Sequence, residues 1–162
     1  MNEIYLRRSV RKFLDKKVEP EKIEKLLRAA MQAPSAKNQQ PWHFIVIDEE
    51  TQLDSIRTIR GGAKHLYTAP LVIVLAVGPD LIANHSEAQD MGCATQNLML
   101  QAVALDIGTI WIGTYSDKET MSEVRKISNL PENYEPYVVL GVGYPDGEGK
   151  RFIDRYKKER RT

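Results

Sequence analysis

An uninterrupted apolar run at residues 70–77, with the sequence PLVIVLAV, limits the fold of this chain more than any other segment. A strand with one face in water alternates apolar and polar side chains, whereas a strand buried on both faces is apolar throughout. Three valines and an isoleucine in the run have β-branched side chains, which favour strands. We therefore expect a central strand here, with other elements covering both of its faces.

Helices and strands are mixed along the rest of the chain. Pro20 marks the start of an amphipathic helix that ends near residue 32, and Asp117 is a typical N-cap residue. Residues 87–105 form the longest predicted helix, which is apolar almost all round, closes near Gly108 and is expected to lie in the core. The other expected elements are helices at residues 4–8, 48–60 and 117–127 and strands at residues 42–47, 109–113 and 137–143.

The length of 162 residues fits one domain with one core. The chain carries 23 Lys and Arg against 22 Asp and Glu, so its net charge of +1 gives no reason to expect a nucleic-acid or membrane partner. Residues 150–162 differ, because they contain seven Lys or Arg and two acidic residues. We expect a domain at residues 1–149 and a basic C-terminal tail at residues 150–162 that needs a partner surface.

Cysteine and histidine usage excludes two further classes of site. Cys93 is the single cysteine, so no intramolecular disulfide can form. His43, His65 and His85 show no spacing typical of metal ligands, and we expect no metal site. The N-terminus has no apolar stretch of the kind that directs secretion, and the longest uncharged run, residues 91–105, is shorter than a bilayer span. We therefore expect a cytoplasmic protein without a membrane-spanning segment.

Three arginines lie within five residues near the N-terminus, at Arg7, Arg8 and Arg11, with Ser9 between them. Each guanidinium offers paired donors in one plane and keeps its charge, so this group can surround a phosphate dianion. A short charged run is more commonly a solvated helix end, and that interpretation stays open for the arginines taken alone.

A polar loop bounded by Pro34 and Pro41 follows the helix that ends near residue 32. Pro41 directly precedes the strand at residues 42–47, which places a fixed loop beside the sheet. Ser35 and Asn38 can contact a ligand from this loop, or they can simply cap backbone groups within it.

Five segments, in this order, resemble the FMN-dependent nitroreductase family over nearly the whole chain. They are RRSVRKF at 7–13, APS at 33–35 with Asn38 and QPW at 40–42, Ala69-Pro70 at the start of a strand, GTIWIG at 108–113 and GVGYP at 141–145. The resemblance implies an α+β nitroreductase-like fold, with a mixed, mainly antiparallel sheet flanked by helices, in an intertwined homodimer. Two FMN molecules would lie at the dimer interface, each held by both chains, and the tail at residues 150–162 would contact the dimer partner.

The resemblance also implies which residues bind FMN. Arg7, Arg8, Ser9 and Arg11 would hold the phosphate and the ribityl chain, and the second subunit would contribute Pro34, Ser35, Ala36 and Asn38. Ile112 and Gly113 would lie at the reactive edge of the ring, where the missing side chain of Gly113 lets a backbone N–H approach N5. Lys150 and Arg151 lie where the family often places further phosphate cations.

The chemistry of the family implies an enzyme that moves electrons from NADH or NADPH to a nitroaromatic, a quinone or a similar small acceptor in a ping-pong cycle. The flavin carries this chemistry, so no catalytic side chain is assigned. Two alternatives stay open, namely the same fold with flavin-fragmenting or dehalogenating chemistry, and a flavin-binding module without turnover. The chain lacks the longer insertions that cover the substrate side in larger relatives, which leaves residues 61–68 and 78–86 to flank the pocket.

Overall fold

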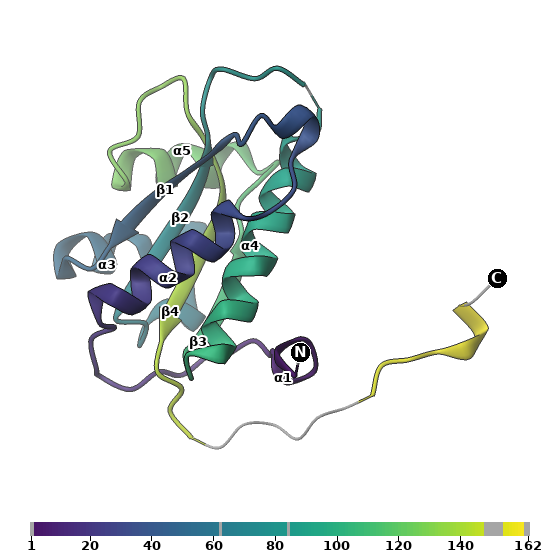
Figure 1. Ribbon diagram of the computed structural model, residues 1–162. Coiled ribbons are helices and arrows are strands. Elements are labelled where there is room, and N and C mark those ends of the chain that lie inside the picture. Colours follow the sequence, from purple (N-terminus) through teal and green to yellow (C-terminus); the bar gives the residue numbers. More distant parts are fainter. Residues whose placement is uncertain (1, 62, 84, 148–153, 161–162) are drawn as a thin grey trace.

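The computed structural model describes residues 2–61, 63–83, 85–147 and 154–160. Its centre is a four-stranded antiparallel sheet with the strand order β1-β2-β4-β3 (Figure 1). The strands are β1 (Trp42–Ile47), β2 (Leu71–Val77), β3 (Gly108–Gly113) and β4 (Glu135–Gly143). Among the described residues, the parallel component of the expected mixed sheet is limited to an isolated bridge between Ser9 and Thr109.

Two layers of helices enclose the sheet (Figure 1). One layer consists of α2 (Pro20–Met31) and α4 (Glu87–Ala104), and the other of α3 (Glu50–Ile56) and α5 (Lys118–Ile127). A short helix, α1 (Glu3–Leu6), lies beside α4. Short 3₁₀ segments occur at η1 (Ala36–Asn38), η2 (Ile59–Gly61), η3 (Lys64–Leu66) and η4 (Lys158–Arg160). The predicted α+β architecture, with helices flanking the sheet, is confirmed.

The central position of β2 is also confirmed, because all seven of its residues are buried. Leu71, Ile73, Leu75 and Val77 belong to the apolar cluster on the side of α2 and α4. Val72 and Val74 belong to the cluster on the opposite face, together with residues of α3 and α5. Water reaches neither face of this strand, which explains why its sequence does not alternate.

The starts of two helices follow from single residues. Pro20 occupies the first turn of α2, where its missing N–H costs nothing. The Asp117 carboxylate accepts a hydrogen bond from Thr120 N at 3.2 Å, so the predicted N-cap of α5 is confirmed. This hydrogen bond lowers the pKa of Asp117, because it stabilises the charged form.

The helix α4 differs from its sequence-based description. It ends before Asp106, which takes a φ of 59°, while Gly108 already belongs to β3. Leu98 is fully buried, but Cys93 and Gln96 on the outer side of α4 are exposed. The prediction that the whole helix lies in the core is therefore wrong for a single chain, because nothing in the described part of that chain covers the outer side of α4 at these residues.

The helix predicted at residues 48–60 is also interrupted. α3 ends at Ile56, and the chain continues through η2, where Arg60 has a φ of 57°. The Ala63 backbone N–H donates to the Arg57 carbonyl at 2.7 Å, so the two residues that flank this part of the chain lie close together before η3.

A charged cluster joins α2 to the end of β4. The Tyr144 hydroxyl donates to Glu19 Oε2 at 2.5 Å and accepts a hydrogen bond from Lys22 Nζ at 2.8 Å. Lys22 Nζ also donates to the Leu105 carbonyl at 3.3 Å. The contact with Tyr144 lowers the pKa of Glu19 and raises the pKa of Lys22, because it stabilises both charged forms. The cluster fixes α2 and the end of α4 at the edge of the sheet where β3 begins.

None of the helices in the described part of the chain is long and apolar enough to cross a membrane. Residues 154–160 are all exposed, and Figure 1 shows them away from the sheet. The division into a domain at residues 1–149 and a tail at residues 150–162 stays a prediction.

Candidate functional site

The arginine-rich segment at residues 7–11 lies beside the first residues of β3. Ser9 forms a parallel bridge with Thr109, and the next backbone N–H donates to the Thr109 carbonyl at 2.9 Å. Within the described part of the chain, the three guanidiniums of this segment make no hydrogen bond and no ion pair. Cations so close together along the chain repel one another, so the segment favours binding of an anion.

Gly108 permits this close approach of the segment to β3. A Cβ atom at this position would lie 2.6 Å from Val10 Cγ2 and 2.8 Å from Val10 Cβ. Val10 is buried, so its side chain has no free space to move into. The sequence suggests a helix end at Gly108, whereas its role in the structure is to let the arginine segment lie against the strand.

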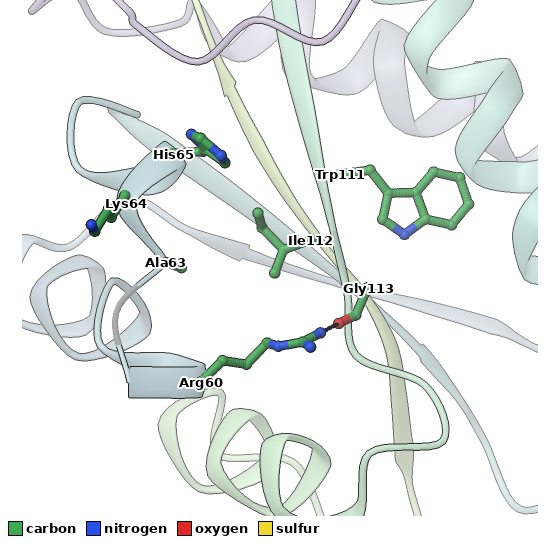
Figure 2. Close-up of a pocket in the computed structure, with 7 residues that line it drawn as sticks. All are labelled: Arg60, Ala63, Lys64, His65, Trp111, Ile112 and Gly113. Atoms are coloured by element: carbon green, nitrogen blue, oxygen red, sulfur yellow. Dashed lines mark hydrogen bonds between the residues drawn. The ribbon is translucent and has the colours of Figure 1, made fainter.

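The other end of β3 borders a pocket of about 400 Å³ (Figure 2). Its lining residues are Arg60, Ala63, Lys64, His65, Trp111, Ile112 and Gly113. Figure 2 shows that Ile112 points toward the segment at residues 60–65, whereas Trp111 points to the opposite side of the strand. Part of the segment at residues 61–68 therefore lies beside Ile112 and Gly113.

Arg60 fixes the shape of this pocket. Its Nη1 donates to the Gly113 carbonyl at 2.7 Å, and its backbone N–H donates to Glu123 Oε2 at 3.3 Å. A Cβ atom at Gly113 would meet nothing within 4 Å, so the strand end is open for a ligand. Lys64 and His65 belong to the segment at residues 61–68 that is expected to flank the pocket, although no motif marks either as a site residue. Arg60 lies just before that segment and is not expected at the pocket, because it lies in an irregular stretch without a recognisable pattern.

The loop at residues 34–40 has a strained backbone. Lys37, Asn38 and Gln40 have φ values of 51°, 53° and 49°, a region that is costly for residues other than glycine. Ser35 Oγ accepts a hydrogen bond from Gln40 N at 3.0 Å, and Asn38 Oδ1 accepts one from Gln40 Nε2 at 3.0 Å. Ser35 thus caps a backbone group within the loop, as the alternative without a ligand predicts, whereas the side chain of Asn38 contacts another side chain and caps no backbone group among the described residues.

A single chain does not bring this loop to the arginines. Ala36 N donates to Asp90 Oδ1 at 3.1 Å in the first turn of α4. Arg8 lines a hollow together with Asp106, just beyond the other end of α4. The roughly 16 residues from Asp90 to Asp106 span about 24 Å at the rise of a helix. The loop and the arginine segment therefore lie at opposite ends of α4.

The expected FMN-binding residues thus fall into two groups and a remainder. The first group lies along β3 and consists of Arg7, Arg8, Ser9, Arg11, Ile112 and Gly113. The second lies in the loop before β1 and consists of Pro34, Ser35, Ala36 and Asn38. Lys150 and Arg151 lie outside the described residues.

Comparison with known proteins identifies relatives over nearly the whole chain. A model of the Nitroreductase family matches residues 4–60 and 58–144. A candidate NADH dehydrogenase/NAD(P)H nitroreductase of Archaeoglobus fulgidus is 39% identical over 162 residues, covering 97% of this chain and 92% of that protein.

Solved structures with the same fold also match nearly the whole chain. A candidate NADH oxidase from Clostridium acetobutylicum has a TM-score of 0.93 and 44% identity, covering 98% of this chain and 96% of that chain. An FMN-dependent nitroreductase from Clostridium difficile has a TM-score of 0.86 and 32% identity, covering 99% of this chain and 96% of that chain.

Gly108→Ala should destabilise the protein by about 1–3 kcal/mol, because the new methyl group overlaps Val10 in a packed site. The measurement is the free energy of unfolding in urea. The double variant Val10→Ala/Gly108→Ala should lose less stability than the sum of the two single variants, because the shorter side chain frees the space. Gly113→Ala is the matched control and should change stability by less than about 0.5 kcal/mol. Additive losses in the double variant would show that Gly108 does not accommodate Val10.

Proposed function

The chain belongs to the nitroreductase family, and we propose that it is an oxidoreductase that uses FMN to move electrons from NADH or NADPH to a small acceptor. The acceptor class that we propose is a nitroaromatic, a quinone or a similar compound, reduced in a ping-pong cycle. The observation that carries the proposal is the arrangement along β3, with guanidiniums at its start that have no partner among the described residues and a bare glycine in an open pocket at its end.

The two ends of β3 fit the two ends of FMN, which is an elongated molecule with a phosphate at one end and a ring at the other. The phosphate is a dianion, and the guanidiniums of Arg7, Arg8 and Arg11 with the Ser9 hydroxyl supply donors for its oxygens. Lys150 and Arg151 would add two more cations. The five steps from Gly108 to Gly113 span about 17 Å, which leaves room for the ribityl chain between phosphate and ring.

The ring would lie at Ile112 and Gly113. At this point no Cβ stands between the strand and a flat ligand, so a backbone N–H can approach its edge. Lys64 and His65, beside Arg60, would place donors near the polar edge of the ring. When bound, FMN would supply the hydride and electron transfer, while these residues would orient it and limit access of water.

The site is completed, in our proposal, by a second copy of the chain. Five of the exposed and half-exposed residues of α4 form a stripe, namely Gln89, Cys93, Gln96, Leu100 and Val103. Their alternating spacing of four and three residues is typical of a helix that packs against another helix. In a two-fold dimer with antiparallel α4 helices, the start of one helix lies beside the end of the other. The loop at residues 34–40 of one copy would then reach the arginine end of the other, and the basic tail would contact the partner.

The purified protein should be yellow and should lose its colour when NADH or NADPH is added without oxygen, because electrons then enter the bound flavin. Absorbance spectra before and after reductant measure this, and addition of a quinone should restore the colour. A protein that stays colourless after soaking in FMN would contradict the proposed cofactor. A yellow protein that neither reductant bleaches would favour the alternative of flavin binding without turnover.

Arg11→Ala should weaken FMN binding by about 10- to 100-fold, the usual effect of losing one charge-assisted hydrogen bond. Binding can be followed by the quenching of flavin fluorescence. Riboflavin lacks the phosphate, so its affinity should be the same for the variant and the wild type. Lys17→Ala removes an exposed charge outside the arginine segment and should change neither affinity. Equal losses for FMN and riboflavin would mean that Arg11 does not bind the phosphate.

In solution the protein should have about twice its chain mass of 18.5 kDa, which light scattering after gel filtration can measure. Gln96 lies at the midpoint of the stripe on α4 and so nearest the two-fold axis. Gln96→Cys in a Cys93→Ser background should therefore form a disulfide-linked dimer under mild oxidation. Glu21→Cys on α2 in the same background is the control and should not cross-link. A monomer that retains FMN would contradict the shared site.

A further inference from the structure

We propose that Gln39 and Asp90 are positioning residues, which hold the loop at residues 34–40 in the shape that completes the FMN site of the partner subunit. This inference rests on the shared site proposed above and extends it to two side chains that contact no proposed ligand. The evidence is the hydrogen bonding of the two side chains and the strain in the loop between their contact points.

The Gln39 carboxamide uses all of its hydrogen-bonding capacity. Its Oε1 accepts from the backbone N–H groups of Ile82, at 3.1 Å, and Ala83, at 2.9 Å. The two hydrogens of its Nε2 are shared among three acceptors, which are the Ala83 carbonyl at 3.3 Å, Ser86 Oγ at 3.2 Å and Asp90 Oδ2 at 2.9 Å. An amide has two donor hydrogens and two acceptor lone pairs, so no other natural side chain of this length reproduces this set.

Asp90 holds the loop at two points with its two carboxylate oxygens. Its Oδ1 accepts from Ala36 N at 3.1 Å, and its Oδ2 accepts from Gln39 Nε2 at 2.9 Å. The side chain is buried, with the residue 5% exposed, and it lies in the first turn of α4, where the helix favours a negative charge. A buried carboxylate with these two donors is a fixed anchor for both ends of η1.

The strain lies between these two anchor points and directly after them. Lys37 and Asn38 lie between Ala36 and Gln39, and both have positive φ values, as does Gln40. Such a backbone persists only when the surrounding contacts impose it. The clamp formed by Gln39 and Asp90 supplies those contacts, and the residues that it constrains include Ala36 and Asn38, which we expect to face the flavin of the other copy.

Gln39→Glu tests the clamp, because it keeps the shape of the side chain but turns the donor that faces Asp90 into a second carboxylate oxygen. FMN affinity should fall by about tenfold or more, since the loop is released from its bound shape. Gln32→Glu makes the same chemical change on an exposed residue at the end of α2 and should leave FMN affinity unchanged. Wild-type affinity in Gln39→Glu would overturn the proposal.

In the double variant Gln39→Glu/Asp90→Asn, the amide at position 90 can donate a hydrogen bond to the carboxylate at position 39. The pair then has one donor and one acceptor again, in the opposite direction from the wild type. Its FMN affinity should lie closer to that of the wild type than the affinity of Gln39→Glu does. An affinity as low as that of the single variant would show that the hydrogen bond between the two side chains is not what holds the loop. Asp90→Asn alone replaces Gln39→Glu in these measurements if the latter chain does not fold, with the same expected loss.

A mixed dimer distinguishes positioning across the interface from a general loss of stability. It pairs one chain carrying Arg11→Ala with one chain carrying Gln39→Glu, purified through two different tags. Both defects then fall on one site and the other site is intact, so about half of the wild-type FMN should be retained. Loss of FMN from both sites would overturn the clamp as an element of the partner's site. A wild-type protein that binds no FMN would instead reject the proposed function itself.

Discussion

The burial of β2 on both faces is the constraint from which the position of the site follows. Helices close both faces of the sheet at its centre, so β2 and its neighbour β4 cannot present side chains to a ligand. Only the edge strands of the sheet can then present side chains to a ligand, and β3 is one of the two edge strands. Residues 9 and 10 cover its start, whereas its end at Gly113 has open space beside it. The end of β3 at Gly113 is therefore open to a ligand, as the proposed FMN site requires.

The arginines at this edge differ from two arginines of the helical layers. Arg28 pairs with Glu24, and Arg57 pairs with two acidic residues of α3. The arginines at residues 7–11 have no such partner among the described residues, although the chain has almost as many acidic as basic residues. An unpaired group of cations is costly unless an anion binds there, since repulsion is not offset by a partner. The local imbalance supports a phosphate site more strongly than the overall charge could.

Features with a local signal could be predicted from the sequence, and features that depend on distant contacts could not. The apolar run of β2 and the cap at Asp117 each depend on neighbouring residues, and both are found as expected. Arg60 contacts Gly113 across 53 positions, and Gln39 contacts Asp90 across 51, so no short pattern encodes either role. The outer side of α4, where Cys93, Leu100 and Val103 alternate with two glutamines, is a related case. Composition shows that a helix face is to be buried, but not whether the same chain or a second copy buries it.

The length of α4 connects these observations. Within one chain this helix holds the strained loop at its start and the arginine segment beyond its end, about 24 Å apart. Strain in a loop that contacts no ligand lowers the stability of a single chain, and no binding free energy offsets that loss. An antiparallel pair of α4 helices would remove this conflict, because each loop would then lie at the arginine end of the other copy. The element that separates the two half-sites in one chain is thus the element that would join them in the dimer, and the clamp at Asp90 fixes the loop to that same helix.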